Sequence, residues 1–566
     1  MTKPDAVIIG SGHNGLVAAN YLADAGLQVR VLERRSIVGG ATVTEELIPG
    51  FRVSSCSYVS GFFHPQVLRD MGLADHGLQM YQTDTGTCNL WRDGQRLYTF
   101  NDTSATLREI ERLKRGESER YLYFGVQLQR LARITEQWLL TTNPPSLQEV
   151  VDTFVRLGER ELYKDFFTSS TKDMVDKYFT ADVLRGLIAF TGTVSVWGGP
   201  RTPGWSYVYA HHATGEFEGH MGQFGFPKGG MGAIADALAA RARSKGVVID
   251  TDTAVAEILS ANGRVTGVRT ESGEHIESDV VLSNADPTAT YLKLVDASAL
   301  PDALVDKMKN YDNRGCMSRV FLAVDRLPTF VGGSTGQGPE HRGLTLLGAS
   351  VDSFSRAEDA QKQGRIAEDF PIEFVIQSVH DDTVAPRGQH IISTGIQQTP
   401  YTLTGTDWDT EKSAFEERVI SVLETYSPGI RETITATATL TPLDYERTYG
   451  ITGANIYHGA MQPGQLFADR PVPGAGGYRS PLEGLYLCGS GTHPGGAVTG
   501  IPGRNGAVAV LEDKFGRRPT ATTRGEPAKT PLIEKAMRNR AFRTVASQVA
   551  RRPALAPLVE RLTTRD

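Results

Sequence analysis

Two glycine-rich stretches carry the residue types and spacings that could do chemistry in this chain. The first contains Gly10, Gly12 and Gly15 in the pattern G-x-G-x-x-G, and Glu33 follows 18 residues after the last glycine. Glycines at these positions allow a tight turn, a close approach of the backbone to a pyrophosphate, and the packing of a helix on a strand. A carboxylate at Glu33 would accept hydrogen bonds from a ribose diol and repel a 2′-phosphate. The pattern therefore predicts a dinucleotide site that disfavours NADP.

A second glycine-rich stretch, LYLCGSGTHPGGAVTGIPGRNGA, lies near the other end of the chain. It reads as a strand, a loop from Gly489 and a helix that begins near Pro502. The start of such a helix directs backbone N–H groups at a nearby anion. Gly39 and Gly40, shortly after Glu33, permit a further close approach of the backbone. FAD needs such room beyond its pyrophosphate and NAD does not, so the pattern favours FAD. The two stretches could bind two cofactors or the two ends of one.

The elements that must position these residues are those of a Rossmann-like βαβ unit. Residues 5–10 and 28–33 read as strands, and residues 14–25 read as the helix between them. Residues 226–287 again read as alternating strands and a helix, but they contain no second G-x-G-x-x-G motif followed by an acid. We therefore expect the later segment to complete the first domain and to carry no nucleotide site of its own.

The segments between these parts have a different character. From about residue 62 to residue 220, apolar residues recur at three- and four-residue spacing, which predicts amphipathic helices. After Pro287, the stretches MSRVFLAV and PIEFVIQSV read as strands, and a helix is expected near residues 411–426. These patterns predict a second domain that mixes a sheet with helices.

Composition and charge argue against several classes of protein. The net charge is −6, and residues 517–566 carry 12 Lys/Arg against 4 Asp/Glu, so the rest of the chain is acidic. An acidic body argues against nucleic acid as a partner. The four cysteines and the histidines lack metal-ligand spacing, so we expect no metal site and buried, apolar cysteines in a reducing compartment. With no secretory signal expected and no apolar run of about 20 residues, we expect a soluble, cytoplasmic protein.

Three sets of residues, taken together, carry a resemblance to a known family. They are AVIIGSGHNGLVAANYL with VLERRSIVGGATVTEE, FPKGGMGAIADAL with SNADP, and NIYHGAMQPGQLFADRPVPGAGGYRSPLEGLYLCGSGTHPGGAVTGIPGRNGA. In this order they resemble the phytoene desaturase-type FAD-dependent oxidoreductases, up to about Phe515. The likeness is greatest to the pyridine nucleotide-disulfide oxidoreductase domain-containing protein 2 group and to the related bacterial carotenoid ketolases.

The resemblance implies an α/β fold, with a Rossmann-like, discontinuous FAD-binding domain and a mixed substrate domain. The FAD-binding domain is expected over residues 1–61, 221–290 and 480–515, the substrate domain over 62–220 and 291–479, and a basic tail over 516–566. One FAD would then span both glycine-rich stretches. Many relatives carry Arg after the paired glycines, where this chain has Ala41. The residues expected to bind FAD are Gly10, Ser11, Gly12, Asn14, Gly15, Glu33, Arg34, Gly40, Ala41, Val255, Gly489, Ser490, Gly500, Ile501 and Pro502.

The resemblance also implies a reaction. A substrate carbon gives a hydride to flavin N5, and a neighbouring carbon loses a proton. We expect an apolar substrate, such as an isoprenoid or carotenoid, and a quinone or O2 as the electron acceptor. No catalytic residue is assigned; the residues considered for proton transfer are His493, Tyr457, His458 and Arg504. Two alternatives stay open, namely a carotenoid ketolase and a non-catalytic flavoprotein that binds or regulates a partner.

The basic tail carries apolar residues at every fourth position. These are Ile533, Met537, Ala541, Val545 and Val549, with arginines between them. A basic amphipathic helix of this kind can lie on an anionic membrane surface. It can also dock on the acidic body of its own chain or make a contact between subunits of a homo-oligomer. The pattern leaves these three interpretations open.

Overall fold

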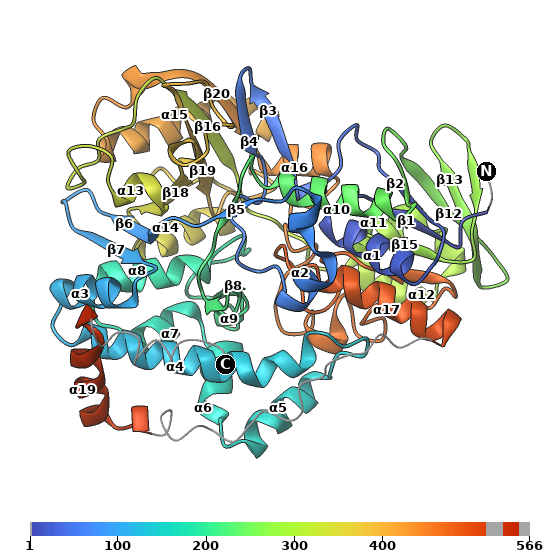
Figure 1. The fold of residues 1–566 in the computed structure, drawn as a ribbon, viewed down its shortest axis with the longest axis horizontal. Coiled ribbons are helices and arrows are strands. Elements are labelled where there is room, and N and C mark those ends of the chain that lie inside the picture. Colours follow the sequence, from blue (N-terminus) through green and yellow to red (C-terminus); the bar gives the residue numbers. More distant parts are fainter. Residues whose placement is uncertain (1–2, 517–535, 554–566) are drawn as a thin grey trace.

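A computed structural model describes residues 3–516 and 536–553 of the chain (Figure 1). One of its sheets is parallel and has five strands in the order β11-β2-β1-β15-β21. Because parallel strands end at the same edge, the loops after β1 and β21 lie near each other and the two glycine-rich stretches meet there. In sheet order, these strands are Val248–Asp250, Val29–Leu32, Ala6–Ile9, Val281–Ser283 and Leu485–Leu487.

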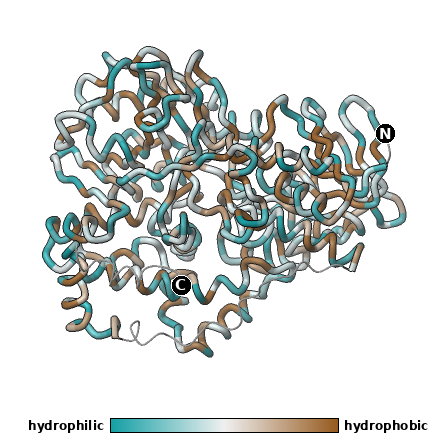
Figure 2. Tube along the Cα trace, viewed as in Figure 1, coloured by the Kyte–Doolittle hydropathy of each residue, from teal (hydrophilic) through white to brown (hydrophobic). Residues whose placement is uncertain are grey.

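Side chains of β1 alternate between two apolar layers, as the two-residue repeat of a strand requires. Ala6 and Ile8 pack against helices α1 and α17, and α10 lies beside α1. Val7 and Ile9 face the other way and pack against an antiparallel sheet of β12, β13 and β14. Hydrophobic residues gather along these central strands (Figure 2). The bounds are His13–Asp24 for α1, Gly232–Ser244 for α10, Ile501–Phe515 for α17, Val255–Ala261 for β12, Arg264–Thr270 for β13 and His275–Glu277 for β14.

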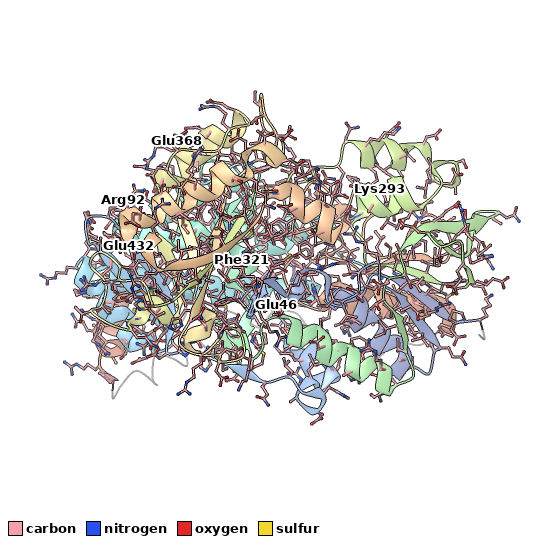
Figure 3. The ribbon with its side chains drawn as sticks, turned by 90° about the horizontal axis from the view of Figure 1, so that it is seen from above. Glu46, Arg92, Lys293, Phe321, Glu368 and Glu432 are labelled. Carbon is pink, nitrogen blue, oxygen red and sulfur yellow. The ribbon has the colours of Figure 1, made fainter. Side chains whose placement is uncertain are left out.

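A second large sheet has seven strands in the order β20-β16-β19-β18-β17-β6-β7. Its neighbouring strands are antiparallel except for β17 and β6, which are parallel. Phe321 of β16 lies inside the molecule, whereas Glu368 lies at its periphery (Figure 3). In sheet order, the strands are Ile434–Leu440, Arg319–Val324, His390–Ile396, Ile372–Val375, Leu344–Leu347, Thr85–Leu90 and Arg96–Phe100.

Helix α15 (Trp408–Tyr426) covers one face of this sheet through Phe415, Val419 and Leu423. On the other side, a group of helices encloses an aromatic core that includes Phe124, Phe166 and Phe190. Local signals set several helix starts; Ser146, for example, forms a capping box with Glu149. These helices are α3 (Thr103–Leu113), α4 (Glu117–Thr135), α5 (Leu147–Arg156), α6 (Arg160–Tyr163), α7 (Thr171–Tyr178), α8 (Asp182–Thr191) and α9 (Ser206–Ala213).

Shorter elements connect these layers. β3 and β4 form a hairpin, β5 pairs with β10, and β8 pairs with β9. Their strands are Thr44–Ile48, Phe51–Ser54, Met80–Tyr81, Phe226–Pro227, Glu216–Phe217 and His220–Met221, in the order just given. The remaining helices are α2 (Pro65–Met71), α11 (Pro287–Ala289), α12 (Asp302–Lys309), α13 (Pro339–Arg342), α14 (Val351–Lys362) and α16 (Pro442–Tyr449).

The fold class expected from the sequence is confirmed, because a Rossmann-like parallel sheet is combined with a mixed sheet and helices. The four cysteines are free and buried, as expected. Among residues 3–516 and 536–553, no group of histidine, cysteine and acidic residues is arranged to hold a metal ion. In the same ranges, no helix has the length and apolar character needed to cross a membrane.

The described part of the tail docks on the body of its own chain. Helix α19 (Arg540–Ala550) lies beside α3 and α4 (Figure 1). Met537 is fully buried against Leu107, Leu122 and Val126. Basic residues of the tail meet acidic ones, as in Arg543 Nε with Glu119 Oε1 at 3.1 Å and Arg551 Nη1 with Glu111 Oε1 at 3.2 Å. Ile533, the first residue of the predicted repeat, lies outside the described residues.

Candidate functional site

A cavity of about 790 Å³ begins at the glycine-rich loops and continues between the helices and the seven-stranded sheet. Gly12, Asn14 and Glu33 line its polar end. Tyr121 and Phe124 of α4 and Phe190 of α8 line the other end. A single cavity therefore joins the predicted dinucleotide site to an aromatic and apolar wall.

The first glycine-rich loop is shaped for a close approach of the backbone. Gly10 has φ of +91°, a conformation that side chains disfavour. A Cβ atom on Gly15 would lie 2.2 Å from the Gly10 carbonyl oxygen, and one on Gly12 would lie 2.7 Å from Asn284 Nδ2. The loop therefore tolerates only glycine at Gly15, which lets α1 start against β1 and direct its N-terminus at the cavity.

The carboxylate of Glu33 lies at the end of β2 and is almost fully buried. Its Oε2 accepts hydrogen bonds from the Ser11 backbone N–H at 2.9 Å and from the Ser11 hydroxyl at 2.8 Å. Its Oε1 accepts from the Arg35 backbone N–H at 2.9 Å. These bonds hold the carboxylate at the cavity, where a ribose diol of a dinucleotide would meet it.

Four buried polar atoms at this end lack a hydrogen-bond partner within residues 3–516 and 536–553. Three are the acceptor-capable atoms His13 Nε2, Asn14 Oδ1 and His458 Nδ1, the fourth is Arg35 Nη1, and all four residues line the cavity. Burial lowers the pKa of His13 to about 3, so its imidazole is neutral at ordinary pH. Buried polar atoms are normally satisfied, so these four fit a polar ligand such as the phosphate and ribityl portion of FAD.

The second glycine-rich stretch packs directly on the first. Asn14 Nδ2 donates to Ser490 Oγ at 3.3 Å, which links the loops after β1 and β21. A Cβ atom on Gly503 would lie 2.1 Å from the Asn14 carbonyl oxygen, so α17 and α1 are in backbone contact. Gly500 has φ of +70° immediately before α17. The two stretches therefore border one cavity, as expected for a single cofactor held at both ends.

Arg470 ties the second stretch to the loop before it. The side chain is fully buried and donates to backbone carbonyl oxygens on both sides. The acceptors include Tyr457 at 2.5 Å, Gln465 at 3.1 Å and Ser490 at 2.9 Å. Burial lowers the pKa of Arg470 from its usual value. Arg470 lies in the quoted FADRPVPGAGG segment, but its role could not be inferred there because it depends on carbonyls that only the folded loops bring together.

The structure separates the residues expected to bind FAD into two groups. Those that line the cavity are Gly10, Gly12, Asn14, Glu33, Arg34, Gly40, Ala41, Val255 and Ser490. Those that lie behind the lining, in the turns and in the first turns of α1 and α17, are Ser11, Gly15, Gly489, Gly500, Ile501 and Pro502. Ser11 acts on the site through Glu33, and Gly15 through the packing of α1. The individual roles of all fifteen stay predictions.

Several cavity residues were not found from the sequence. His13, Asp286, Ala497 and Val498 line the same end as the expected set. All four lie in segments that carry the family resemblance, Asp286 in SNADP and His13 inside the first glycine-rich loop, so those segments could have identified them. They reach the cavity because the loops after β1 and β15 and the loop before α17 meet at the same sheet edge.

Of the four residues considered for proton transfer, two line the cavity and two lie outside its lining. Tyr457 and His458 line the cavity. His493 lies outside the lining and is buried, with its Nε2 hydrogen-bonded to the Trp138 carbonyl oxygen at 2.8 Å. Arg504 is also buried outside the lining and donates to Asn505 Oδ1 at 2.9 Å. The contacts of His493 and Arg504 are those of structural residues.

A parallel sheet whose glycine loops converge on one cavity defines a dinucleotide-binding protein of the Rossmann type. More specifically, the chain belongs to the family of flavin containing amine oxidoreductases, whose model matches residues 15–504. Membership makes the chain a flavin-dependent oxidoreductase, and FAD is its cofactor.

Relatives with known names cover nearly the whole chain. It is 36% identical over 547 residues to pyridine nucleotide-disulfide oxidoreductase domain-containing protein 2 of Mus musculus, with 90% of this chain and 93% of the relative covered. It is 26% identical over 552 residues to a phytoene desaturase (neurosporene-forming) of Cereibacter sphaeroides, with 94% and 98% covered. Cyclohexylamine oxidase from Brevibacterium oxydans shares the fold, with a TM-score of 0.56, 16% identity, and coverage of 91% and 100%. The family resemblance seen in the sequence is thus confirmed.

Proposed function

We propose that this protein is an FAD-dependent dehydrogenase or desaturase of an apolar, isoprenoid-type substrate. The observation that carries the proposal is the single cavity, which is polar at the glycine loops and mainly apolar beyond them. The apolar walls come from three helices, one strand and two loop residues. The residues are Tyr121, Leu122, Phe124, Leu128, Leu187, Ile188, Phe190, Tyr209, Leu344, Met317 and Ile456.

Bound FAD supplies the chemistry, because its flavin accepts a hydride from a substrate carbon. The chain positions the two reactants. The glycine loops and Glu33 hold the dinucleotide half, while the apolar walls take up a hydrocarbon chain and exclude water from it. A named relative that is a phytoene desaturase supports an isoprenoid substrate for this chain as well.

A quinone or O2 is the proposed electron acceptor. Residues 3–516 and 536–553 contain one G-x-G-x-x-G loop with a following acid, and we assign this loop to FAD. A second bound dinucleotide therefore has no prepared site in that part of the chain. A freely diffusing quinone or O2 needs no such site.

We also propose that the protein meets its substrate at an anionic membrane surface. Phe542 is 41% exposed and Val545 is 59% exposed on the outer side of α19, next to the exposed Arg540. The inner side of α19 packs on α3 and α4, whose residues Thr106 and Tyr121 line the cavity. Sedimentation with vesicles that contain anionic lipid tests this contact, and Phe542→Ser/Val545→Ser should reduce the bound fraction. Equal sedimentation of both proteins would contradict it.

The experiment that tests the function is anaerobic bleaching of the bound flavin. The holoprotein is mixed separately with a lipid extract, with polar metabolites including amines, and with NADH. Bleaching by the lipid extract alone is the expected result. Bleaching by polar compounds alone would reject the apolar substrate, and rapid bleaching by NADH would favour an oxygen-inserting ketolase. Flavin that no compound bleaches would favour a non-catalytic flavoprotein.

A further inference from the structure

A buried carboxyl lies in the mainly apolar part of the cavity. It is the carboxyl of Glu373, on β18, and only 2% of the residue is exposed. Glu373 pairs with Gly395 of the neighbouring strand β19. A Cβ atom on Gly395 would lie 2.3 Å from Glu373 Oε1, so the glycine leaves room for the carboxyl. The fold therefore accommodates an acid at a position where an apolar side chain would be expected.

Both oxygens of this carboxyl have a defined partner. The Tyr58 hydroxyl donates to Glu373 Oε2, and Gln397 Nε2 donates to Glu373 Oε1 at 2.8 Å. Gln397 Oε1 in turn accepts from the Ser195 backbone N–H at 2.7 Å, so the amide is fixed in the orientation that donates to Glu373. Tyr58 and Glu373 both line the cavity. The group is thus held in one orientation at the cavity wall.

A buried guanidinium lies behind this pair. The Arg319 guanidinium carbon is 3.9 Å from the centroid of the Tyr58 ring, and Nη1 donates to the Ser54 carbonyl oxygen at 3.0 Å. Arg319 is fully buried, and its Nε and Nη2 have no hydrogen-bond partner within residues 3–516 and 536–553. A positive charge in this position stabilises the ionised form of a nearby carboxyl. Burial opposes this effect and raises the pKa of Glu373 above its usual value.

We infer that Glu373 is the proton acceptor of the oxidation, an inference that rests on the proposed function. One substrate C–H bond breaks and its hydride passes to FAD. The neighbouring C–H bond breaks, its proton passes to the Glu373 carboxylate, and its electron pair forms the new C=C bond. The products are the alkene, the reduced cofactor and a neutral Glu373, which is hydrogen-bonded by Tyr58 and Gln397.

The other titratable groups at this part of the cavity are less suited to the role. Burial lowers the pKa of His212 and of His458, which makes each a weaker base. Tyr58, Tyr445 and Tyr457 face Glu373, and burial raises their pKa values well above the usual range, so they stay neutral. A carboxyl with a raised pKa is closer to the working pH, where proton transfer is most effective. Arg319 is the charged group that faces it.

The test compares wild-type holoprotein with Glu373→Gln, which keeps the size of the side chain. With the compound that bleaches the wild-type flavin, the variant should be bleached about 10²- to 10⁴-fold more slowly. FAD content and the flavin spectrum should be unchanged. The wild-type rate should fall as the pH is lowered through the raised pKa of Glu373, because only the carboxylate accepts a proton. Equal bleaching rates for the two proteins, or a slow rate for His212→Gln alone, would overturn the inference.

A second measurement does not depend on turnover. Dicyclohexylcarbodiimide modifies protonated carboxyls in apolar surroundings, and mass spectrometry locates the adduct. Glu373 should be modified below its pKa and protected as the pH rises. Glu340, which is equally buried but lies outside the cavity lining, is the control and should stay unmodified. If Glu373 is not modified, the inference is overturned, even where no compound that reduces the flavin has been found. If Glu373 is modified but only polar compounds bleach the flavin, the proposed apolar substrate is rejected and the inference about Glu373 is not.

Discussion

The Glu33 carboxylate shapes the loop after β1, and we predict that it also binds a ribose diol of the cofactor. Its carboxylate accepts from the Ser11 backbone N–H and hydroxyl and so holds the turn that follows β1. The same carboxylate lines the cavity, where it can accept from a ribose diol. Both the bonds to Ser11 and a bond to a ribose diol need oxygen atoms that accept hydrogen bonds. A carboxylate has two such oxygens, whereas the amide of a glutamine at this position has one.

Replacement of Glu33 by Gln should therefore weaken FAD binding. Loss of charged hydrogen bonds costs about 1.5–3 kcal/mol, which corresponds to a roughly 10- to 150-fold rise in Kd. Titration of apoprotein with FAD, followed by quenching of flavin fluorescence, measures the change. Glu46→Gln is the matched control, because Glu46 is an exposed acid on β3 and lies outside the cavity lining. Equal affinities of the two variants would contradict the role of Glu33.

At the scale of elements, Arg470 holds two loops together through backbone carbonyls alone. One loop contains Tyr457 and His458, which line the cavity, and the other contains Ser490. A buried carbonyl oxygen that loses its hydrogen-bond donor destabilises the fold by its full desolvation free energy. The position of the second glycine-rich stretch therefore depends on a residue outside that stretch.

Replacement of Arg470 by Met should lower the free energy of unfolding by about 3–5 kcal/mol and loosen the bound flavin. Thermal unfolding and flavin release on gel filtration measure the two effects. Arg431→Met is the control, since Arg431 makes an exposed ion pair with Glu417 worth about 0–1 kcal/mol. An Arg470 variant that unfolds like the control would show that the loops hold their positions without it.

Docking of the tail on α3 and α4 also belongs to this scale. Met537 is fully buried, so Met537→Ala should weaken docking by about 2–5 kcal/mol, up to the full docking free energy. Digestion with trypsin should then cleave the arginine-rich tail faster in this variant. Val545→Ala is the matched control, because Val545 belongs to the same segment and is 59% exposed. If both variants are cleaved at the same rate, Met537 does not anchor the tail.

At the scale of the whole molecule, buried neutral histidines make the fold sensitive to acid. Burial lowers the pKa of His211 to about 3 and that of His493 to about 4. Both bond to backbone carbonyl oxygens, His211 to Gly496 at 3.1 Å and His493 to Trp138 at 2.8 Å. In the unfolded chain these rings take up a proton near pH 6.5. Their contribution to stability is therefore present above about pH 6.5 and is lost as the pH falls toward 4.

The expected result is a decrease in the free energy of unfolding of about 1.4 kcal/mol per pH unit for each histidine below pH 6.5. Thermal unfolding of the holoprotein between pH 7 and pH 5 measures this slope as a fall in midpoint temperature. The variant His493→Gln removes one titrating group and should show a shallower fall. A variant with the wild-type slope would mean that His493 is solvated or charged in the folded state.

Whether a feature of the fold or the site could be predicted from the sequence depends on how far apart in the chain its contacting residues lie. The turn at Gly10–Gly15 and the acid at Glu33 are set by backbone conformation and by contacts within one βαβ unit, so their spacing predicts them. The apolar periodicity likewise predicts the helices of the aromatic core. Arg470 and His13 could not be found in this way, because their partners are backbone groups or cavity surfaces that no spacing encodes.

By itself, the sequence determined the family, the FAD cofactor and the glycine loops, because these rest on local turns whose geometry allows few residues. Only the tertiary structure decided that the buried carboxyl of Glu373 lines the cavity. Tyr58 and Glu373 are 315 positions apart and come together because the loop after β4 crosses the face of the seven-stranded sheet. It also decided that the described tail packs on its own chain, since burial of Met537 depends on α3 and α4. Contacts between residues so far apart in the chain depend on how the sheets and helices pack, and the spacing of residues in the sequence does not predict that packing.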